Sequence, residues 1–181
     1  PNAAVAGTVL DGLLGRDFLS SFDLEFDRGR VTLHRVAGCS GRFLPWTAAY
    51  RAVPTEESVD TAVVLPVSVD GVGLRALLDS GANNSLLAVL GIARMKLTEA
   101  ALASDPVVGG SGVGRQTVRY RVHTFKSLTV GGATIGAPRV LVAPVAIVPR
   151  VDMLLGAEWL LRHHVWVSFA TRQLFLEDRI R

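Results

Sequence analysis

The segment Leu77–Leu87 (LLDSGANNSLL) constrains the fold of this 181-residue chain more than any other part of its sequence. Two leucines lead into Asp79-Ser80-Gly81, polar residues follow, and two further leucines end the segment. Because Asp, Ser and Gly all favour turns, the pattern predicts a tight turn between apolar strands with a carboxylate at its tip. Taken alone, such a turn is most simply a connection between two strands.

A second element, about seventy residues downstream, changes this interpretation. The apolar stretch Leu154-Leu155-Gly156 is followed by a short helical pattern and two strand-like runs, at 157–163, 165–169 and 174–176. In this order the two elements resemble the retropepsin-like aspartic peptidases. The family's loop has two apolar residues, Asp-Thr/Ser-Gly-Ala, two polar residues, a small hydroxyl residue and two aliphatic residues, and every class is filled here. The resemblance places the Leu-Leu-Gly stretch beside the loop, in the core and without a chemical role.

The resemblance also implies roles for the loop residues. Asp79 would be one of two carboxylates that share a proton and hold a water for attack on a peptide carbonyl. Ser80 would hydrogen-bond backbone across the junction between two such loops, and Gly81 would permit their close approach. Ala82 completes the loop. Asn83 would contact the substrate, although retroviral members commonly carry an acidic residue there.

A glycine-rich segment lies between the two elements, at Gly109-Gly110-Ser111-Gly112-Val113-Gly114, and an alternating strand pattern follows at 118–122. By resemblance this is the flap that closes over substrate, with binding residues Gly110, Ser111, Gly112, Val113 and Gly114. Glycines at a hairpin tip supply the backbone freedom that opening requires. The alternatives are a flexible surface hairpin or a phosphate-binding loop. Phosphate binding is disfavoured because neither Lys-Ser/Thr nor a helical pattern follows the glycines.

The chain contains an internal repeat. Residues 11–19 match residues 152–160 at a spacing of 141, and residues 26–33 match residues 169–176 after a two-residue shift. Repeats of this kind mark duplicated structural units. The first copy lacks a catalytic half, because no Asp-Ser/Thr-Gly precedes Leu13.

We therefore expect a tandem protein with a first unit of which only the C-terminal part is present. Residues 1–35 would form that part, residues 36–59 the connection between lobes, and residues 60–181 a complete second lobe. Pro1 is consistent with a maturation or truncation boundary, since neither an initiator Met nor a signal-peptide pattern is present. The second catalytic aspartate would come from the missing N-terminal fragment or from a second copy in a homodimer. We favour the first source, because a tandem repeat joins two lobes without association cost.

Composition is consistent with a globular, mainly β chain. Hydrophobic residues make up 49% of the sequence and charged residues 19%, which excludes a disordered chain. Strand patterns separated by turn residues predict a closed β-barrel lobe of the retropepsin or pepsin type, at 61–69, 72–78, 118–130 and 139–148. Gly131-Gly132 predicts a hairpin turn. Helical patterns are confined to 97–103 and 157–163.

Several other classes of function gain little support. The net charge of +3 comes from scattered arginines, so no nucleic-acid partner is expected. No run approaches the ~18 apolar residues needed to span a bilayer. The adjacent His163 and His164 have no further ligands at metal spacing, and no metal or other cofactor is expected. A single cysteine, Cys39, excludes an intrachain disulfide. The sequence does not define the location, although some bacterial relatives are periplasmic or exported.

The sequence therefore predicts an aspartic endopeptidase that hydrolyses polypeptide substrates through a water held between Asp79 and a second aspartate. The alternative is a non-catalytic retropepsin-like module that binds peptides or mediates dimerisation. An Asp-Ser/Thr-Gly loop in the missing half-unit would favour the enzyme, and its absence would favour the binding module.

Overall fold

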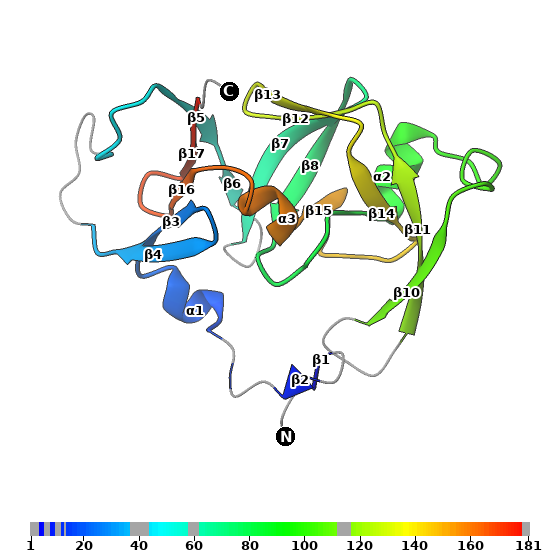
Figure 1. The fold of residues 1–181 in the computed structure, drawn as a ribbon, viewed down its shortest axis with the longest axis horizontal. Helices are drawn as coiled ribbons and strands as arrows, with labels where there is room; N and C mark the ends of the chain where they lie inside the picture. The colour runs from blue at the N-terminus through cyan, green and yellow to red at the C-terminus, as the bar shows by residue number, and fades with distance from the viewer. Residues whose placement is uncertain are drawn as a thin grey trace.

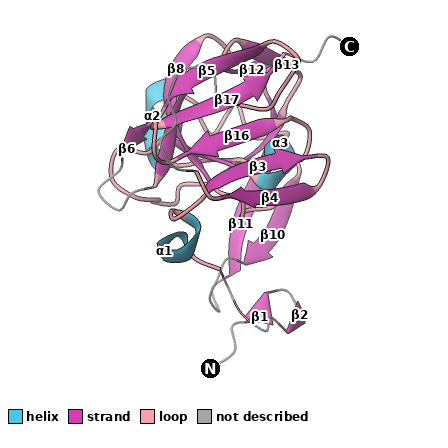
Figure 2. Ribbon diagram, turned by 90° about the vertical axis from the view of Figure 1, so that its left-hand side faces the viewer, coloured by secondary structure: helices cyan, strands magenta, loops and turns pink. Residues whose placement is uncertain are grey.

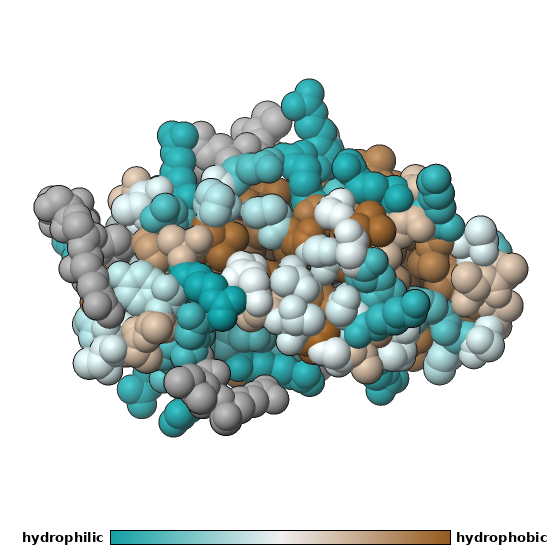
Figure 3. Space-filling model, turned by 90° about the horizontal axis from the view of Figure 1, so that it is seen from above, coloured by the Kyte–Doolittle hydropathy of each residue, from teal (hydrophilic) through white to brown (hydrophobic). Residues whose placement is uncertain are grey.

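The structure is a computed structural model that describes residues 4–5, 8–9, 12, 14–36, 44–57, 62–111 and 117–178. These residues are mainly β and form two principal sheets, one of ten strands and one of five, that lie beside each other (Figure 1). A pair of two-residue strands, β1 (Ala4–Val5) and β2 (Thr8–Val9), lies near the N-terminus. Polar side chains cover much of the surface seen in Figure 3, with apolar groups showing between them.

The larger sheet is built from strands that lie between residues 56 and 155 of the sequence. From one edge to the other its strands are β10 (Val107–Ser111), β11 (Thr117–Thr124), β14 (Arg139–Val142), β9 (Leu86–Leu87), β15 (Met153–Leu155), β8 (Val72–Leu78), β7 (Val63–Val69), β12 (Ser127–Val130) and β13 (Ala133–Gly136), with β6 (Glu56–Glu57) paired to β7. β15 runs parallel to β8 and antiparallel to β9, whereas β7 and β8 form an antiparallel hairpin.

Most of these strands follow the sequence prediction. The predicted strand at 72–78 is confirmed, and the hairpin at Gly131-Gly132 joins β12 to β13 with both glycines at positive φ. The predicted strand at 118–130 is two strands, and that at 139–148 ends at Val142. The expected closed barrel is a curled half barrel in the described residues, with β10 and β13 as its edges. β10 extends away from the core with β11, and Val107 on it is 55% exposed.

The helices differ from the prediction between residues 89 and 103, and the helix predicted at 157–163 ends at Leu160. No helix forms at 97–103, where backbone N–H groups bond mainly three residues back, as from Ala101 to Thr98 (3.1 Å). Lys96, at φ 54°, ends the preceding helix, and only Leu102 of this segment is buried, so little packing stabilises a further helix here. That preceding helix, α2 (Val89–Met95), was not predicted. Its interior Gly91 suggests a break, but a Cβ there would lie 2.5 Å from the Asp152 carbonyl oxygen, so packing requires glycine.

The smaller sheet is built from both copies of the internal repeat. Its order is β4 (Arg30–His34), β3 (Asp23–Asp27), β16 (Val165–Ser168), β17 (Gln173–Glu177) and β5 (Tyr50–Pro54), seen face-on in Figure 2. Leu24 on β3 lies opposite Val167 on β16. The spacing of 143 that relates 26–33 to 169–176 also makes these two residues equivalent. A residue paired with its own equivalent marks an approximate two-fold axis between the two hairpins.

The two repeats also agree in their helices. α1 (Arg16–Leu19) and α3 (Ala157–Leu160) are four residues long and occupy equivalent positions at the 141-residue spacing. The symmetry fails at the sheet edges, because β5 pairs with β17 and no described strand pairs with the outer edge of β4. On β4, Val31 is 51% exposed.

One hydrophobic core joins the two sheets. It includes Leu24 and Val167 of the smaller sheet and Leu65, Met153 and Leu155 of the larger one. Burial of these side chains is the main favourable contribution to folding.

The segment between the two copies of the sequence repeat contributes to the smaller sheet. Leu44 and Trp46 are buried with Trp166 and Phe175 in a second cluster, and β5 continues the sheet. Phe43 and Cys39 lie outside the described residues. Trp46 and Tyr50 therefore pack this segment against the smaller sheet.

A carboxylate on β3 links this segment to both repeats. Glu25 accepts hydrogen bonds from His164 (2.7 Å), Trp46 (2.8 Å) and His34 (2.9 Å). The other ring nitrogen of His164 lies 3.0 Å from Glu177. Burial opposes ionisation of Glu25, but the hydrogen bonds and the charge of His164 outweigh it and lower the pKa of Glu25 below its usual 4.5. The ionised carboxylate is thus the form that the fold stabilises.

We predict that Glu25→Gln destabilises the protein by about 1–3 kcal/mol near neutral pH, because an amide cannot replace a carboxylate that accepts three hydrogen bonds. A pKa lowered on folding contributes stability above the unfolded value, and this contribution disappears as pH falls below 4.5 through the folded value. Urea unfolding of the unaltered protein and of Glu25→Gln should therefore show a difference in the free energy of unfolding that becomes smaller below pH 4.5. The control is Glu99→Gln, on an 87% exposed side chain. A loss of unfolding free energy in Glu25→Gln that stays constant down to acidic pH would contradict this explanation.

Candidate active site

Asp79 follows the last residue of β8, at the point where the chain leaves the sheet. Its N–H donates to the Leu155 carbonyl oxygen (3.0 Å), which continues the parallel pairing of β8 with β15 by one residue. Its Oδ1 accepts the Gly81 N–H (2.9 Å), and its carbonyl oxygen accepts the Ala82 N–H (3.2 Å). These bonds form a tight turn in which the carboxylate is half-buried while Ser80 and Gly81 are exposed.

The first turn of α3 holds the second half of the loop. The N–H groups of Ala157 and Glu158 donate to the carbonyl oxygens of Ala82 (2.8 Å) and Asn83 (3.3 Å). These donors are available because the first N–H groups of any helix lack partners within it. The loop backbone thus supplies the cap that Gly156, at the N-cap position, cannot supply with a side chain.

Ser85 completes this attachment from the loop side. Its buried hydroxyl accepts the Gly156 N–H (3.0 Å), and its own N–H donates to Glu158 Oε1 (2.8 Å). Ser85 and Glu158 were not predicted from the sequence as site residues. The sequence did contain a signal for Ser85, because the loop pattern includes a small hydroxyl residue at this position. The other Glu158 oxygen is buried and has no hydrogen-bond partner among the described residues.

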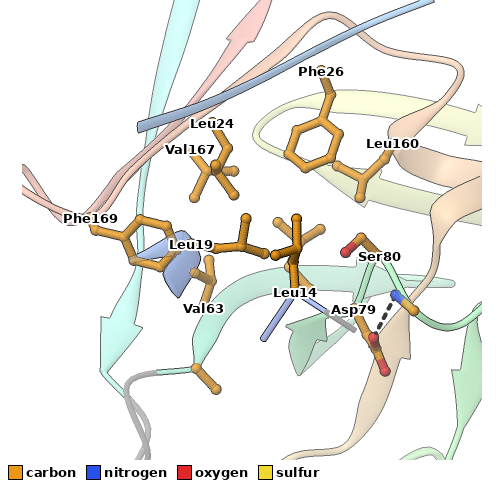
Figure 4. Close-up of a pocket in the computed structure, with 13 residues that line it drawn as sticks. Leu14, Leu19, Leu24, Phe26, Val63, Asp79, Ser80, Leu160, Val167 and Phe169 are labelled. Carbon is orange, nitrogen blue, oxygen red and sulfur yellow. Dashed lines mark hydrogen bonds between the residues drawn. The ribbon is translucent and has the colours of Figure 1, made fainter. Parts of the chain in front are cut away.

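A cavity of about 270 Å³ opens beside Asp79 (Figure 4). Asp79, Ser80 and Gly81 form one side of it, and the remaining wall is apolar. That wall consists of Leu14, Leu19, Leu24, Phe26, Ala62, Val63, Leu78, Leu160, Val167 and Phe169. The carboxylate therefore lies at the boundary between solvent and an apolar hollow.

The predicted site residues are only partly brought together. Asp79, Ser80, Gly81, Ala82 and Asn83 share one loop, and the Asn83 side chain is exposed. The described part of the glycine-rich segment, residues 109–111, lies in β10, which pairs antiparallel with β11. Of the predicted flap residues Gly112, Val113 and Gly114 lie outside the described residues, Ser111 ends β10, and Gly110 lies against the ring of Tyr120. The role of this hairpin as a flap stays a prediction.

The adjacent His163 and His164 each contact other groups in the structure. His163 Nδ1 lies 2.7 Å from the Trp159 carbonyl oxygen, and His164 lies between Glu25 and Glu177. In the described part of the chain, no group of three or more His, Cys, Asp or Glu residues is arranged to hold a metal ion.

None of the helices in the described residues is both long enough and apolar enough to cross a membrane.

Comparison with known proteins identifies the class. A profile of the aspartyl protease family matches residues 65–159, which include the whole Asp79 loop and β15. The fold is similar to the crystal structure of a retropepsin-like aspartic protease from Rickettsia conorii, with a TM-score of 0.50 and 16% identity over 74% of this chain and 96% of that one. No curated protein matches the chain in sequence.

Two further solved structures are more distantly similar. The retroviral protease-like domain of Ddi1 from Leishmania major has a TM-score of 0.47 and 24% identity, over 66% of this chain and 90% of that one. EIAV protease complexed with the inhibitor HBY-793 has a TM-score of 0.37 and 22% identity, over 56% and 86%.

The profile covers more than half of the sequence, and the chain therefore belongs to the aspartyl protease family. Its fold is retropepsin-like and mainly β. Membership of this family supports a protease-type function.

We predict that Gly156→Ala destabilises the protein by about 1–3 kcal/mol, because a Cβ there would lie 2.6 Å from the Asn84 carbonyl carbon and 2.8 Å from its oxygen. The matched control is Gly73→Ala in β8, where a Cβ would have no neighbour within 4 Å. Urea unfolding of both variants measures the difference. Equal free energies of unfolding for the two variants would show that the close contact between Gly156 and the Asn84 backbone does not contribute to stability.

Proposed function

We propose that this chain is an aspartic endopeptidase component in which Asp79 is one of two catalytic carboxylates. The observation that carries the proposal is the position of Asp79, on a loop held at both ends by β15 and α3 and open to an apolar cavity. Such attachment suits catalysis, because a reacting group gains most when its geometry is fixed before the reaction. Membership of the aspartyl protease family supports the same conclusion.

The chemistry requires a second carboxylate close to the first. Two carboxylates a few ångströms apart share one proton, because both cannot be ionised at such a distance. The ionised member takes a proton from water as the water attacks the peptide carbonyl, and the protonated member donates its proton to the carbonyl oxygen. The carboxyl that gained the proton of the water then protonates the leaving amide nitrogen as the C–N bond breaks. Ser80 and Gly81 would position the pair, and Asn83 with the glycine-rich hairpin (Gly110 to Gly114) would contact a polypeptide substrate.

Two sources of the second aspartate follow from the tandem organisation that we propose. Residues 60–181 would be a complete unit, residues 36–59 the connection, and residues 1–35 the end of another unit whose catalytic half carries the second Asp-Ser/Thr-Gly. The other source is Asp79 of a second copy. A non-catalytic peptide-binding or dimerisation module is the competing function.

A tandem form of the chain tests the proposal. In this form a second copy of residues 56–153 precedes residues 13–181, so that Met153 of the added copy is joined to Leu13. The repeat makes Leu13 equivalent to Leu154, and the new junction therefore resembles the natural bond between Met153 and Leu154. We predict that this form cleaves an unfolded polypeptide. Asp79→Asn in either copy should reduce the rate roughly 10²–10⁴-fold, because each removes one of the two proton-transferring groups. Glu99→Gln, which removes the same charge from an exposed side chain, should leave the rate unchanged.

The original chain is assayed beside the tandem form over a range of concentrations. A rate that rises with the square of its concentration would assign the second aspartate to a second copy. A tandem form that folds, as circular dichroism would show, yet cleaves nothing would favour the binding module.

A further inference from the structure

We propose that α1 and the cavity beside it form a docking surface for a second strand carrying an Asp-Ser/Thr-Gly loop, and that a second copy of this chain does not occupy it. This inference names the partner of the proposed active site and so rests on the proposed function. The surface consists of Leu14, Gly15, Asp17 and Phe18 together with the apolar cavity wall.

The cavity lies on the approximate two-fold axis. Three pairs of residues in its wall are repeat equivalents, namely Leu19 with Leu160, Leu24 with Val167, and Phe26 with Phe169. The remaining wall is one-sided, because Val63, Leu78 and the Asp79 loop have no counterparts elsewhere in the described residues. Half of a symmetric arrangement is thus present around the cavity, and Figure 4 shows Asp79 and Ser80 on one side of it only.

The apolar residues of α1 match those that bury the Asp79 unit against α3. Leu155 is fully buried opposite Leu78, whereas its equivalent Leu14 is 70% exposed. Trp159 is 2% exposed, whereas its equivalent Phe18 is 46% exposed. Large apolar side chains that are buried in one repeat and exposed in the other indicate an interaction surface.

The polar residues of α1 match as well. Glu158 binds the N–H of Ser85, and its equivalent Asp17 is an exposed acid with no hydrogen-bond partner in the part of the chain described. Gly156 makes room for the Asn84 backbone, while a Cβ on its equivalent Gly15 would meet only Asp17. The arrangement of apolar residue, glycine, acid and aromatic residue is the one that holds residues 79–85 in the second unit. The partner is therefore expected to carry an apolar strand, Asp-Ser/Thr-Gly, and a small hydroxyl residue four positions after the glycine.

The β3–β16 pairing excludes a second copy that joins this sheet through its own β16. β3 already occupies the free edge of β16, so a second copy cannot add its own β16 there. The docking surface is instead continuous with the interface that β3 and β16 form between the two repeats. The occupant is a segment that completes the first repeat.

Cysteine labelling tests the docking surface without relying on activity. Leu14→Cys is placed in a Cys39→Ser background, in both the original chain and the tandem form, and its rate of reaction with a maleimide is measured. We expect labelling about tenfold slower or more in the tandem form, because docking would bury position 14 as Leu155 is buried. Val31→Cys on β4 is the matched control, and it should react at the same rate in both forms.

Each further outcome decides one part of the inference. Equal labelling of position 14 in both forms would overturn the docking surface, even if the tandem form cleaves polypeptide. If labelling of position 14 in the original chain becomes slower as the concentration of the protein rises, a second copy occupies the surface. That result would overturn the exclusion of a second copy. Protection in the tandem form without cleavage would support the docking surface while the proposed catalytic function fails.

Discussion

The pairing of β15 with β8 is the interaction on which the site depends. It places Leu155 beside Leu78, and the next backbone bond, from the Asp79 N–H to Leu155, begins the loop. Because β15 leads through Gly156 directly into α3, the strand that pairs with the start of the loop is covalently joined to the helix that holds the far end of the loop. The position of the Asp79 carboxylate is therefore set by one short continuous element.

The internal repeat gives this unit an asymmetric neighbour. Hairpins of equivalent sequence meet across β3 and β16, and the Glu25 cluster adds charged hydrogen bonds that link β3, β16 and Trp46. The two repeats nevertheless differ in what covers their helices. α3 is buried by the loop that it holds, while α1 presents equivalent residue types to solvent. Among the described residues, the symmetry of the repeat thus holds for the β3–β4 and β16–β17 hairpins and does not extend to the Asp79 side of the cavity.

Much of the fold could be predicted because its signals are local. The alternation in 72–78, the paired glycines at 131–132 and the turn residues at 79–81 each specify a backbone conformation through nearest neighbours. α2 could not be predicted, since Gly91 is required by a carbonyl oxygen from Asp152, far away in sequence. The helix expected at 97–103 does not form, because Leu102 is the one buried side chain in this segment and its packing alone does not stabilise a helix. Ser85 and Glu158 were not predicted for a related reason, because the hydrogen bond between them joins residues 73 positions apart in the sequence.

The sequence by itself determined the chemical content of the site, the presence of a repeat and the mainly β character of the chain. Residue type and short-range periodicity carry this information, and both can be read along the chain. Only the tertiary structure decided that α3 holds the loop, that Leu24 pairs with Val167, and that Leu14 is exposed beside Asp79. These facts depend on contacts between residues distant in sequence, whose geometry is set by packing of the two sheets around one core.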